Sequence, residues 1–594
     1  MQQKNGSNWK YDKALDCMLF FAQRVDELLF HHTTDTYRFP ALSLSGIADE
    51  FCTVYEDAKR GIIHKKNCSH IIEEFNDRLK KDSLAKSILS AEYVERFEKN
   101  HENWDIKQQY ENITYIYRKL GNYAYYNAIK KRLKELIKEN KEKKEIDSLA
   151  TRWVREVIDC GYTENYVYRA LHQVFYHDKV DSIDSLDRFF NMFNFKKRKY
   201  DVYIGFSEDL TPIKSLFEKM ILYDAKIVLL TPSEAPKGIK TKNQRTIIKF
   251  ESIRELDIFS AYEKAFDIST RIVDSYAFFR HDGSSIKIYG QVVDEDKSIV
   301  HIIQKQLLKD RVSPLSRLDS KKNADELLTA LFSNRRNLND LQKIVKIHNS
   351  ALKSENINDS LLSLWSLIES LFISDNNEES KEENDNSQYK SGTVIELLIP
   401  FLKSTYVSKL VQTFIADVKH WDQNFFDDFI VANGFGENEL EHAFAFLTFE
   451  STQTARDELY SRTSQYPLLK NRVCILYEQL HDIKSIKATL AAHKKRLTWQ
   501  IQRIYRARNY IIHDGRSNDR LNHDLLINLH SYVDTLISKI VELINKSPYN
   551  DTVLDIITEH KLEVSIFDEM LEKQKNENIN ETNAKKLLYY RFSE

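Results

Sequence analysis

Apolar residues recur at helical spacing along most of this chain. The period is clear from about Asp12 to Phe195, for example in ALDCMLFFAQRVDELLF and WVREVIDCGYTENYVYRALHQVF, and it returns from about Asn323 onwards. In between, short apolar runs predict strands at DVYIGF, KIVLLTP and IKIYGQVV, with a helix at PIKSLFEKMILYD between the first two. The pattern predicts a mainly α protein with a small α/β insert in the middle.

These changes of pattern divide the chain into four regions. We expect a helical N-terminal region at 1–195, a small α/β domain at 196–320, a helical domain at 321–548 and a helical C-terminal tail at 549–594. The third region is interrupted at 374–392 by SDNNEESKEENDNSQYKSG, which is acidic and contains no aliphatic residue. Such a segment cannot bury enough surface to offset its ordering entropy, so we expect a flexible loop within one domain.

Composition narrows the class of protein. With only 13 Gly and 8 Pro in 594 residues, long helices are favoured over a turn-rich β architecture. The 87 Lys and Arg nearly balance the 89 Asp and Glu, so any binding of nucleic acid must be local. The five cysteines form no CxxC pair, which fits reduced thiols. No secretory signal and no run of about 18 uncharged apolar residues is present, so we expect a cytoplasmic protein without a membrane segment.

The strongest candidate site lies near the end of a predicted helix, in RARNYIIHDG (506–515). At about 100° per residue, Arg508 falls on an apolar stripe. The other members of that stripe are Ile501, Ile504, Tyr505 and Ile512. A neighbouring polar stripe contains Gln502, Arg506, Asn509 and His513. The helix should end at Asp514 and Gly515, because glycine suits the left-handed cap position.

An arginine at the edge of a core must be paired or line a cleft, because burying it unpaired costs several kcal/mol. The best partner is Glu369, which borders the apolar stripe of LLSLWSLIESLF (361–372). Arg508 could equally belong to a buried ion pair that fixes helix register, and this role would be compatible with function.

The residue types on these stripes suit cleavage of a phosphodiester. Asn509 and His513 are four apart, so the amide can orient the imidazole, while Arg508 or Arg506 can hold a phosphate. The imidazole can take a proton from a ribose 2′-hydroxyl or donate one to the leaving oxygen, and arginine stabilises charge developing on phosphorus. This chemistry acts on RNA only and needs no cofactor or metal, so we expect neither. Alternatively, His513 only caps the helix dipole.

The stretch resembles a known family through Tyr505, Arg508, Asn509, Ile511, His513 and Gly515. These residues resemble the signature of HEPN domains, in which four to six residues separate Arg from His, in the form with Asn directly after the Arg. The segment IESLF (368–372) resembles the earlier helix of the Apea-like HEPN group of bacterial anti-phage defence proteins. The resemblance covers roughly 323–546. A looser Arg–His spacing recurs from Arg516 to His523, which we expect to be a decoy in a loop.

The resemblance implies an all-α helical bundle that dimerises and forms a composite, metal-independent endoribonuclease cleft. Arg508, His513 and Asn509 would be catalytic, supported by Glu369 and Arg506. The implied function is an anti-phage (abortive infection) or toxin-like effector that cuts RNA, with transfer RNA a reasonable candidate substrate. The N-terminal half would sense or regulate, responding to a phage-derived trigger.

Two other hypotheses stay open. The same helices could form a non-catalytic HEPN module that binds RNA, a nucleotide or a protein, with Arg508 structural. In that case His513→Ala would leave biological activity intact. The α/β insert could instead be an enzyme, although it contains no nucleophile with a base partner, no carboxylate pair at metal-binding spacing and no glycine-rich phosphate loop.

Overall fold

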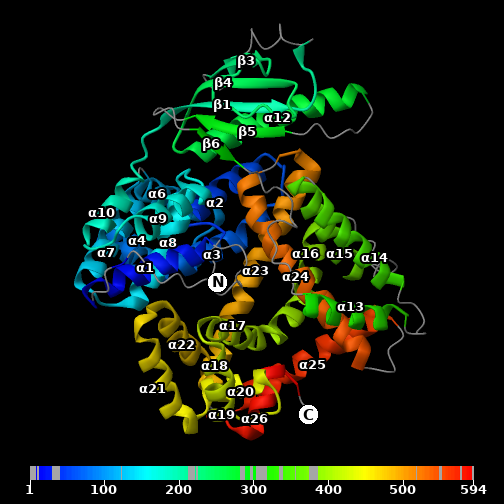
Figure 1. The fold of residues 1–594 in the computed structure, drawn as a ribbon. Coiled ribbons are helices and arrows are strands. Elements are labelled where there is room, and N and C mark those ends of the chain that lie inside the picture. Colours follow the sequence, from blue (N-terminus) through cyan, green and yellow to red (C-terminus); the bar gives the residue numbers. More distant parts are fainter. Residues whose placement is uncertain are drawn as a thin grey trace. The chain divides into compact units, whose positions relative to one another are not determined.

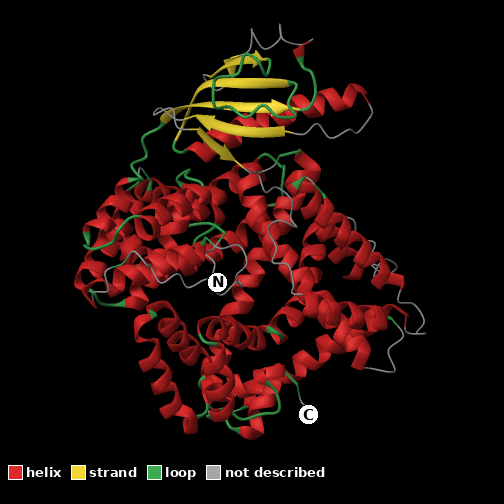
Figure 2. Ribbon diagram, in the orientation of Figure 1, coloured by secondary structure: helices red, strands yellow, loops and turns green. Residues whose placement is uncertain are grey.

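The computed structural model confirms a mainly helical protein with a small sheet, 77% helix and 7% strand (Figure 2). The structure describes residues 9, 13–29, 41–121, 123–211, 221–222, 225–280, 288–293, 299–302, 317–332, 339–354, 356–372, 386–516, 518–546, 552–574 and 578–591. Within these ranges, no helix has the length and apolar character needed to cross a membrane.

The chain forms two compact units, which divide it differently from the predicted regions. The larger unit combines Asp16–Thr151 with Gln306–Glu594, and the smaller combines Asn5–Leu15 with Arg152–Lys305. The helical N-terminal region is therefore shared between the units, and its first part folds with the C-terminal half. Helical periodicity alone carries no information about which helices pack together, so it did not reveal this division.

The smaller unit contains a six-stranded antiparallel sheet in the order β2-β3-β4-β1-β5-β6. The centre of the sheet pairs β1 with β4, a strand that the sequence pattern missed. Ile221 and Leu222, expected in a helix, form β2, whereas 212–220 lie outside the described residues. The strands are β1 Arg198–Phe206, β2 Ile221–Leu222, β3 Ala225–Leu230, β4 Thr246–Glu255, β5 Ile288–Val293 and β6 Ile299–Ile302.

Side-chain alternation in the sheet buries both faces. Val202, Ile204 and Phe206 pack in one core with residues of α12 (Ile258–Arg280), whereas Tyr203 faces a smaller cluster with Ile247 on the opposite side. The helices of this unit are the end of α8 (Lys143–Asp159), α9 (Glu164–His172), a π-helical turn (Gln173–His177), α10 (Asp184–Asn191) and α12.

In the larger unit, the first segment folds into short amphipathic helices with local caps. For example, Ser43 accepts a hydrogen bond from the Gly46 amide at the start of α2, and Asp105 forms a capping box with Gln108 at the start of α6. The helices are α1 Asp16–Leu28, α2 Leu44–Lys59, α3 Ser69–Lys81, α4 Ser83–Ile88, α5 Ala91–Asn100, α6 Ile106–Leu120, α7 Ala124–Glu139 and the start of α8.

The C-terminal half of the larger unit contains two hydrophobic cores rather than one domain and a tail. The first core joins α13 Arg317–Phe332, α14 Asn339–Lys353, α15 Ile357–Phe372, α16 Asn386–Ser404, α24 Asp519–Lys546 and parts of α23 Ile483–Asp514 and α25 Val553–Lys573. The second joins α17 Tyr406–Trp421, a π-helical turn Phe426–Ile430, α20 Glu439–Thr448, α21 Gln453–Arg462, α22 Pro467–Leu480, α26 Glu581–Tyr589 and the remaining parts of α23 and α25. The short helices α18 Gln423–Phe425 and α19 Val431–Asn433 flank that π-helical turn.

Helices α23 and α25 belong to both cores, and the expected tail at 549–594 packs into them (Figure 1). Its apolar residues include Ile556 and Ile557 in the first core and Phe567 and Leu588 in the second. The region 549–594 is helical, as predicted, and contributes buried residues to both cores.

The last part of the segment predicted as an acidic loop is helical. Helix α16 begins at Asn386, so 386–392 are helical, and 373–385 lie outside the described residues. Once the apolar run that starts near Thr393 forms a helix, each polar residue added to its N-terminal end needs no new nucleation event. The lack of aliphatic residues therefore did not mark the helix boundary.

Candidate active site at the end of helix α23

Helix α23 carries the RARNYIIHDG stretch and ends where the sequence predicted. Its N-cap is Asp482, whose carboxylate accepts a hydrogen bond of 2.6 Å from the Ser485 amide. Its C-cap is Gly515, in the left-handed region with φ 62°. A Cβ on Gly515 would meet no atom within 4 Å, so the backbone conformation accounts for the glycine, and not a shortage of space.

The apolar stripe of α23 is confirmed for three of its members and wrong for the fourth. Ile501, Ile504 and Tyr505 are buried in the first core, where the Tyr505 ring lies 5.6 Å from that of Trp365. Ile512, however, is 48% exposed. Ile511 in the same turn packs against the core, but none of the described helices buries Ile512, so periodicity predicts an apolar position there without a partner.

Arg508 and Glu369 meet, as the sequence predicted. The Arg508 Nη2 lies 3.4 Å from Glu369 Oε2, and the side chains are 21% and 20% exposed. Nη1 of Arg508 also donates a hydrogen bond of 3.0 Å to Asn509 Oδ1. A guanidinium has five N–H donors, so these contacts leave donors for a phosphate. Arg508 is thus held at the edge of the core by a carboxylate but remains accessible.

His513 lies in the last turn of α23 and is exposed. Among the described residues, Arg508 donates a hydrogen bond to the Asn509 amide oxygen, and there is none between Asn509 and His513. The expected orienting contact is therefore not formed here. The structure brings Arg508, Asn509 and Glu369 together and leaves His513 one turn further along, toward solvent.

Arg506, expected to help hold a phosphate, is buried and engaged elsewhere. Its side chain is 3% exposed and forms an ion pair with Glu50 of α2 and a close contact with His70 of α3. A guanidinium committed to these partners cannot reach a substrate, so the interpretation of Arg506 as a supporting site residue is corrected. The helical stripe gave its direction, but the partners come from more than 400 residues earlier in the chain.

Arg506 belongs to a buried charge cluster, formed by Glu50, His70, Glu74, Arg503 and Arg506. Nη2 of Arg503 lies 2.8 Å from Glu50 and 2.7 Å from Glu74. Burial alone would raise the pKa of Glu50, but the charges of Arg503 and Arg506 outweigh it and lower this pKa to about 2. Burial and the charge of Arg506 lower the pKa of His70 well below its usual value.

Arg78 of α3 also pairs with Glu74, so three guanidiniums face two glutamates and a neutral imidazole. The cluster links α2 and α3 to α23 at Arg503 and Arg506, immediately before Arg508. The sequence pattern did not predict this cluster, and its only signal was Arg503, another charged residue on a helix that packs a core.

A second contact from α2 holds the end of α23. The Tyr510 hydroxyl donates a hydrogen bond of 2.8 Å to Asp57 Oδ2, and Arg516 Nη2 lies 3.1 Å from the same oxygen. Asp57 is only 4% exposed at its side chain. Burial, followed by the hydrogen bond to Asp57, raises the pKa of Tyr510. Through Asp57, helix α2 therefore contacts Tyr510, which precedes His513, and Arg516, which follows it.

The decoy spacing from Arg516 to His523 does not form a second site. Arg516 is committed to Asp57, and its guanidinium lies over the Tyr510 ring at 5.0 Å. His523 was expected in a loop, but it lies in α24 and is 9% exposed. The predicted loop spans only the residues between Asp514 and Asp519.

Chemically, the end of α23 offers an exposed imidazole and an accessible guanidinium at the edge of a core, on a helix that the N-terminal helices hold firmly. Such a pair can bind a phosphate and exchange a proton with it. The chain matches no protein-family model, no curated protein and no solved structure. The likeness to HEPN domains therefore rests on the residues quoted above.

Proposed function

We propose that this protein is a metal-independent HEPN endoribonuclease that acts in the cytoplasm as an anti-phage (abortive infection) or toxin-like effector. One observation carries the proposal: Glu369 holds Arg508 at the core edge, and His513 follows it, exposed, in the last turn of the same helix. A purely structural role for Arg508 would not explain why an exposed histidine follows it five residues later.

In the proposed reaction, the 2′-oxygen of a ribose bonds to the adjacent phosphorus as the bond to the 5′-oxygen breaks. The 2′-hydroxyl loses a proton and the leaving 5′-oxygen gains one, so a base and an acid are both required. Arg508 would stabilise the charge on the phosphoryl oxygens. The products are a 2′,3′-cyclic phosphate and a 5′-hydroxyl, and the attacking 2′-hydroxyl restricts the substrate to RNA.

The need for two proton-transfer groups supports a homodimer. The candidate motif supplies a single imidazole, His513. A second copy of the chain, related by a two-fold axis close to His513, would supply another. The 48% exposed Ile512 is adjacent to His513 and gives such a contact an apolar centre. Dimerisation through the helices of the first core would therefore complete the site.

The proposed role of the N-terminal half is regulation. Helices α2 and α3 hold α23 through the charge cluster and through Asp57, close to both Arg508 and His513. A change in the N-terminal helices on sensing a phage-derived trigger would alter the position of the catalytic residues or the dimer contact. An RNase that stops growth gains most from cutting translation components, so transfer RNA is the substrate that we would test first.

The decisive experiment compares wild type with His513→Ala. Purified wild type should cleave single-stranded RNA without added magnesium and leave cyclic or 3′-phosphate ends, and the variant should not. His481→Ala is a matched control, because His481 is the C-cap residue of α22, so it too lies at the C-terminal end of a helix, and it is 37% exposed. Strict magnesium dependence, 5′-phosphate products, or equal cleavage by His513→Ala with its fold intact would refute the proposal.

A second candidate function is a non-catalytic HEPN module that binds RNA, a nucleotide or a partner protein. The observation that favours it is that Asn509 is hydrogen-bonded to Arg508 and leaves the His513 imidazole unoriented by that amide. Under this hypothesis, His513→Ala protects cells from phage as well as wild type does, and purified protein binds RNA without producing fragments.

A further inference from the structure

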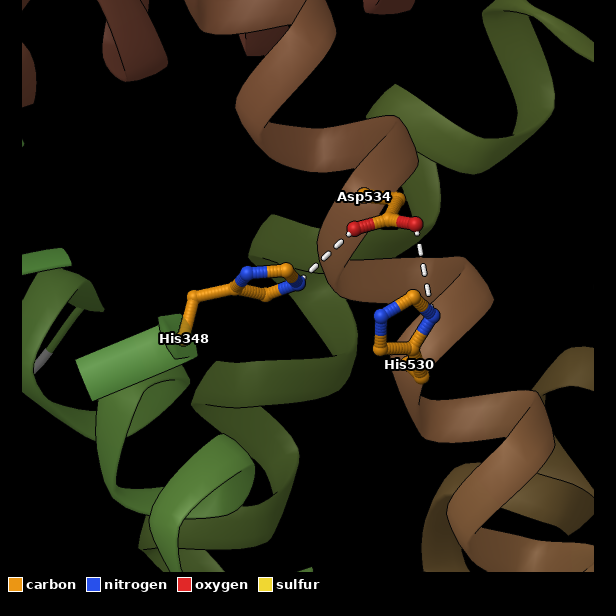
Figure 3. Close-up of side chains that lie close together, drawn as sticks. All are labelled: His348, His530 and Asp534. Carbon is orange, nitrogen blue, oxygen red and sulfur yellow. Dashed lines mark ion pairs between the residues drawn. The ribbon is translucent and has the colours of Figure 1, made fainter. Parts of the chain in front are cut away.

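A group of potential metal ligands lies on helices α14 and α24, which contribute to the first core but do not carry Arg508 or His513. His348 comes from α14, and His530 and Asp534 are one turn apart on α24. Figure 3 shows the Asp534 carboxylate between the two imidazoles, with one oxygen turned toward each ring. Two helices that are distant in the sequence thus present three metal-ligand groups to one point.

The separations between these groups fit a single ion. His348 Nε2 lies 3.0 Å from Asp534 Oδ1, and His530 Nδ1 lies 3.3 Å from Oδ2. One ligand atom from each residue lies within 4.8 Å of the other two. Tetrahedral zinc with bonds of about 2.0–2.1 Å places its ligands about 3.3 Å apart, so only small side-chain movements would close the site.

The imidazole nitrogens have hydrogen-bonding capacity that the described residues do not satisfy. Nε2 of His348 and Nε2 of His530 are buried, and neither has a hydrogen-bond partner. The short approach of His348 to Asp534 is therefore not aligned as a hydrogen bond. Buried polar atoms are nearly always paired, and such exceptions commonly mark a water or an ion. His530 faces Asp534 with Nδ1, so the unpartnered Nε2 of His348, beside the carboxylate, is the independent indication of a ligand there.

Burial and access also suit a metal. His530 is nearly buried, with 8% of its side chain exposed. His348 is 20% exposed and Asp534 is 50% exposed, so an ion can enter from the carboxylate side. Water can occupy a fourth position from the same side.

We propose that His348, His530 and Asp534 bind a divalent transition-metal ion, with zinc the preferred occupant. Two imidazoles and one carboxylate suit zinc, whereas magnesium and calcium prefer oxygen ligands. The ion links α14 to α24 and so stabilises the helical bundle that carries the candidate active site. It lies outside the set Arg508, Asn509, His513 and Glu369, so a ribonuclease reaction without metal is compatible with a structural zinc ion.

The test uses the full chain, stripped of metal and titrated with zinc chloride by calorimetry, with cobalt as a spectroscopic probe. Wild type should bind one ion per chain and show the visible bands of tetrahedral cobalt. Asp534→Asn keeps the size of the side chain but removes a charged ligand, and it should weaken zinc binding by more than about 100-fold, beyond the loss typical of an outer-shell partner. The thermal midpoint should rise with zinc in wild type but not in Asp534→Asn.

His348→Gln provides a second variant on the other helix, and His481→Gln provides the control. His481 lies 3.4 Å from Asp482 but belongs to no three-ligand group among the described residues, so its loss should not alter zinc binding. No zinc binding by wild type, or equal binding by wild type and Asp534→Asn, would overturn the proposal. In that case the three side chains form only an ion-paired triad. Zinc content and RNA cleavage are separate readouts, so this proposal and the ribonuclease proposal can fail independently.

Discussion

Arg506 and Arg508 are two residues apart on one helix but lie in different surroundings. Arg506 is 3% exposed and meets Glu50 and His70, which come from the N-terminal helices. Arg508 is 21% exposed and meets Glu369 within the first core. The same residue type is therefore a structural contact on one face of α23 and a candidate catalytic group on another. The difference is set by which part of the chain covers each face.

The largest effect should come from a substitution in the buried charge cluster that contains Arg506. Glu50→Gln removes the carboxylate that faces both Arg503 and Arg506. We expect it to lower the free energy of unfolding by about 3–5 kcal/mol, because removing one partner leaves a buried charge uncompensated. Urea denaturation monitored by circular dichroism measures this change, with Glu73→Gln on the surface of α3 as the control. A loss below about 1 kcal/mol would mean that water reaches the cluster.

On the other face, removing the arginine should affect the reaction rather than the fold. Under the ribonuclease proposal, we expect Arg508→Ala to reduce the rate of RNA cleavage by about 10²–10³-fold, the range for loss of one donor to a developing oxyanion. Single-turnover cleavage of a labelled RNA measures the rate. Arg462→Ala, a surface arginine paired with Glu458, is the control and should cleave at the wild-type rate. If Arg508→Ala unfolds the protein instead, its role is structural, like that of Arg506.

These two arginines also show how far sequence reasoning reaches. Local rules predicted the end of α23 at Gly515 and the pairing of Arg508 with Glu369, because helical periodicity gives the direction of a side chain and burial demands a partner. They failed for Arg506 and Ile512, because the element that covers a face can come from anywhere in the chain. Here α2 and α3 cover Arg506, and no described helix buries Ile512.

The same limit explains the other misses. The mainly α class and the central sheet could be predicted from periodicity, but the division of the N-terminal helices between two units could not. His530 and Asp534 have a recognisable spacing of one helical turn, yet the third member, His348, lies on a helix that only the tertiary fold brings close. A metal site split in this way gives no motif that a single sequence can reveal.

A smaller effect should appear in the pH dependence of the buried cluster. The folded-state pKa of His70 is lowered well below its usual value, so the unfolded state binds more protons as the pH falls. Neutral His70 makes its full contribution to the free energy of unfolding above pH of about 6.5. Below that pH the free energy of unfolding falls by up to about 1.4 kcal/mol per pH unit. His70→Gln should remove that part of the slope of unfolding free energy between pH 7 and pH 5.5, while keeping an acceptor for Arg506. An unchanged slope would place His70 in contact with solvent.

The smallest effect should come from the ion pair at the edge of the core. Glu369→Gln leaves Arg508 one-fifth exposed with an amide oxygen as its partner, so we expect a loss of no more than about 1 kcal/mol in the free energy of unfolding. Chemical denaturation beside Glu50→Gln gives a direct comparison of the two faces. If Glu369→Gln nevertheless impairs cleavage as much as Arg508→Ala does, then the carboxylate positions the guanidinium for the substrate. If cleavage is unaffected, Asn509 alone is enough to hold Arg508 in place, since its amide oxygen already accepts from Nη1.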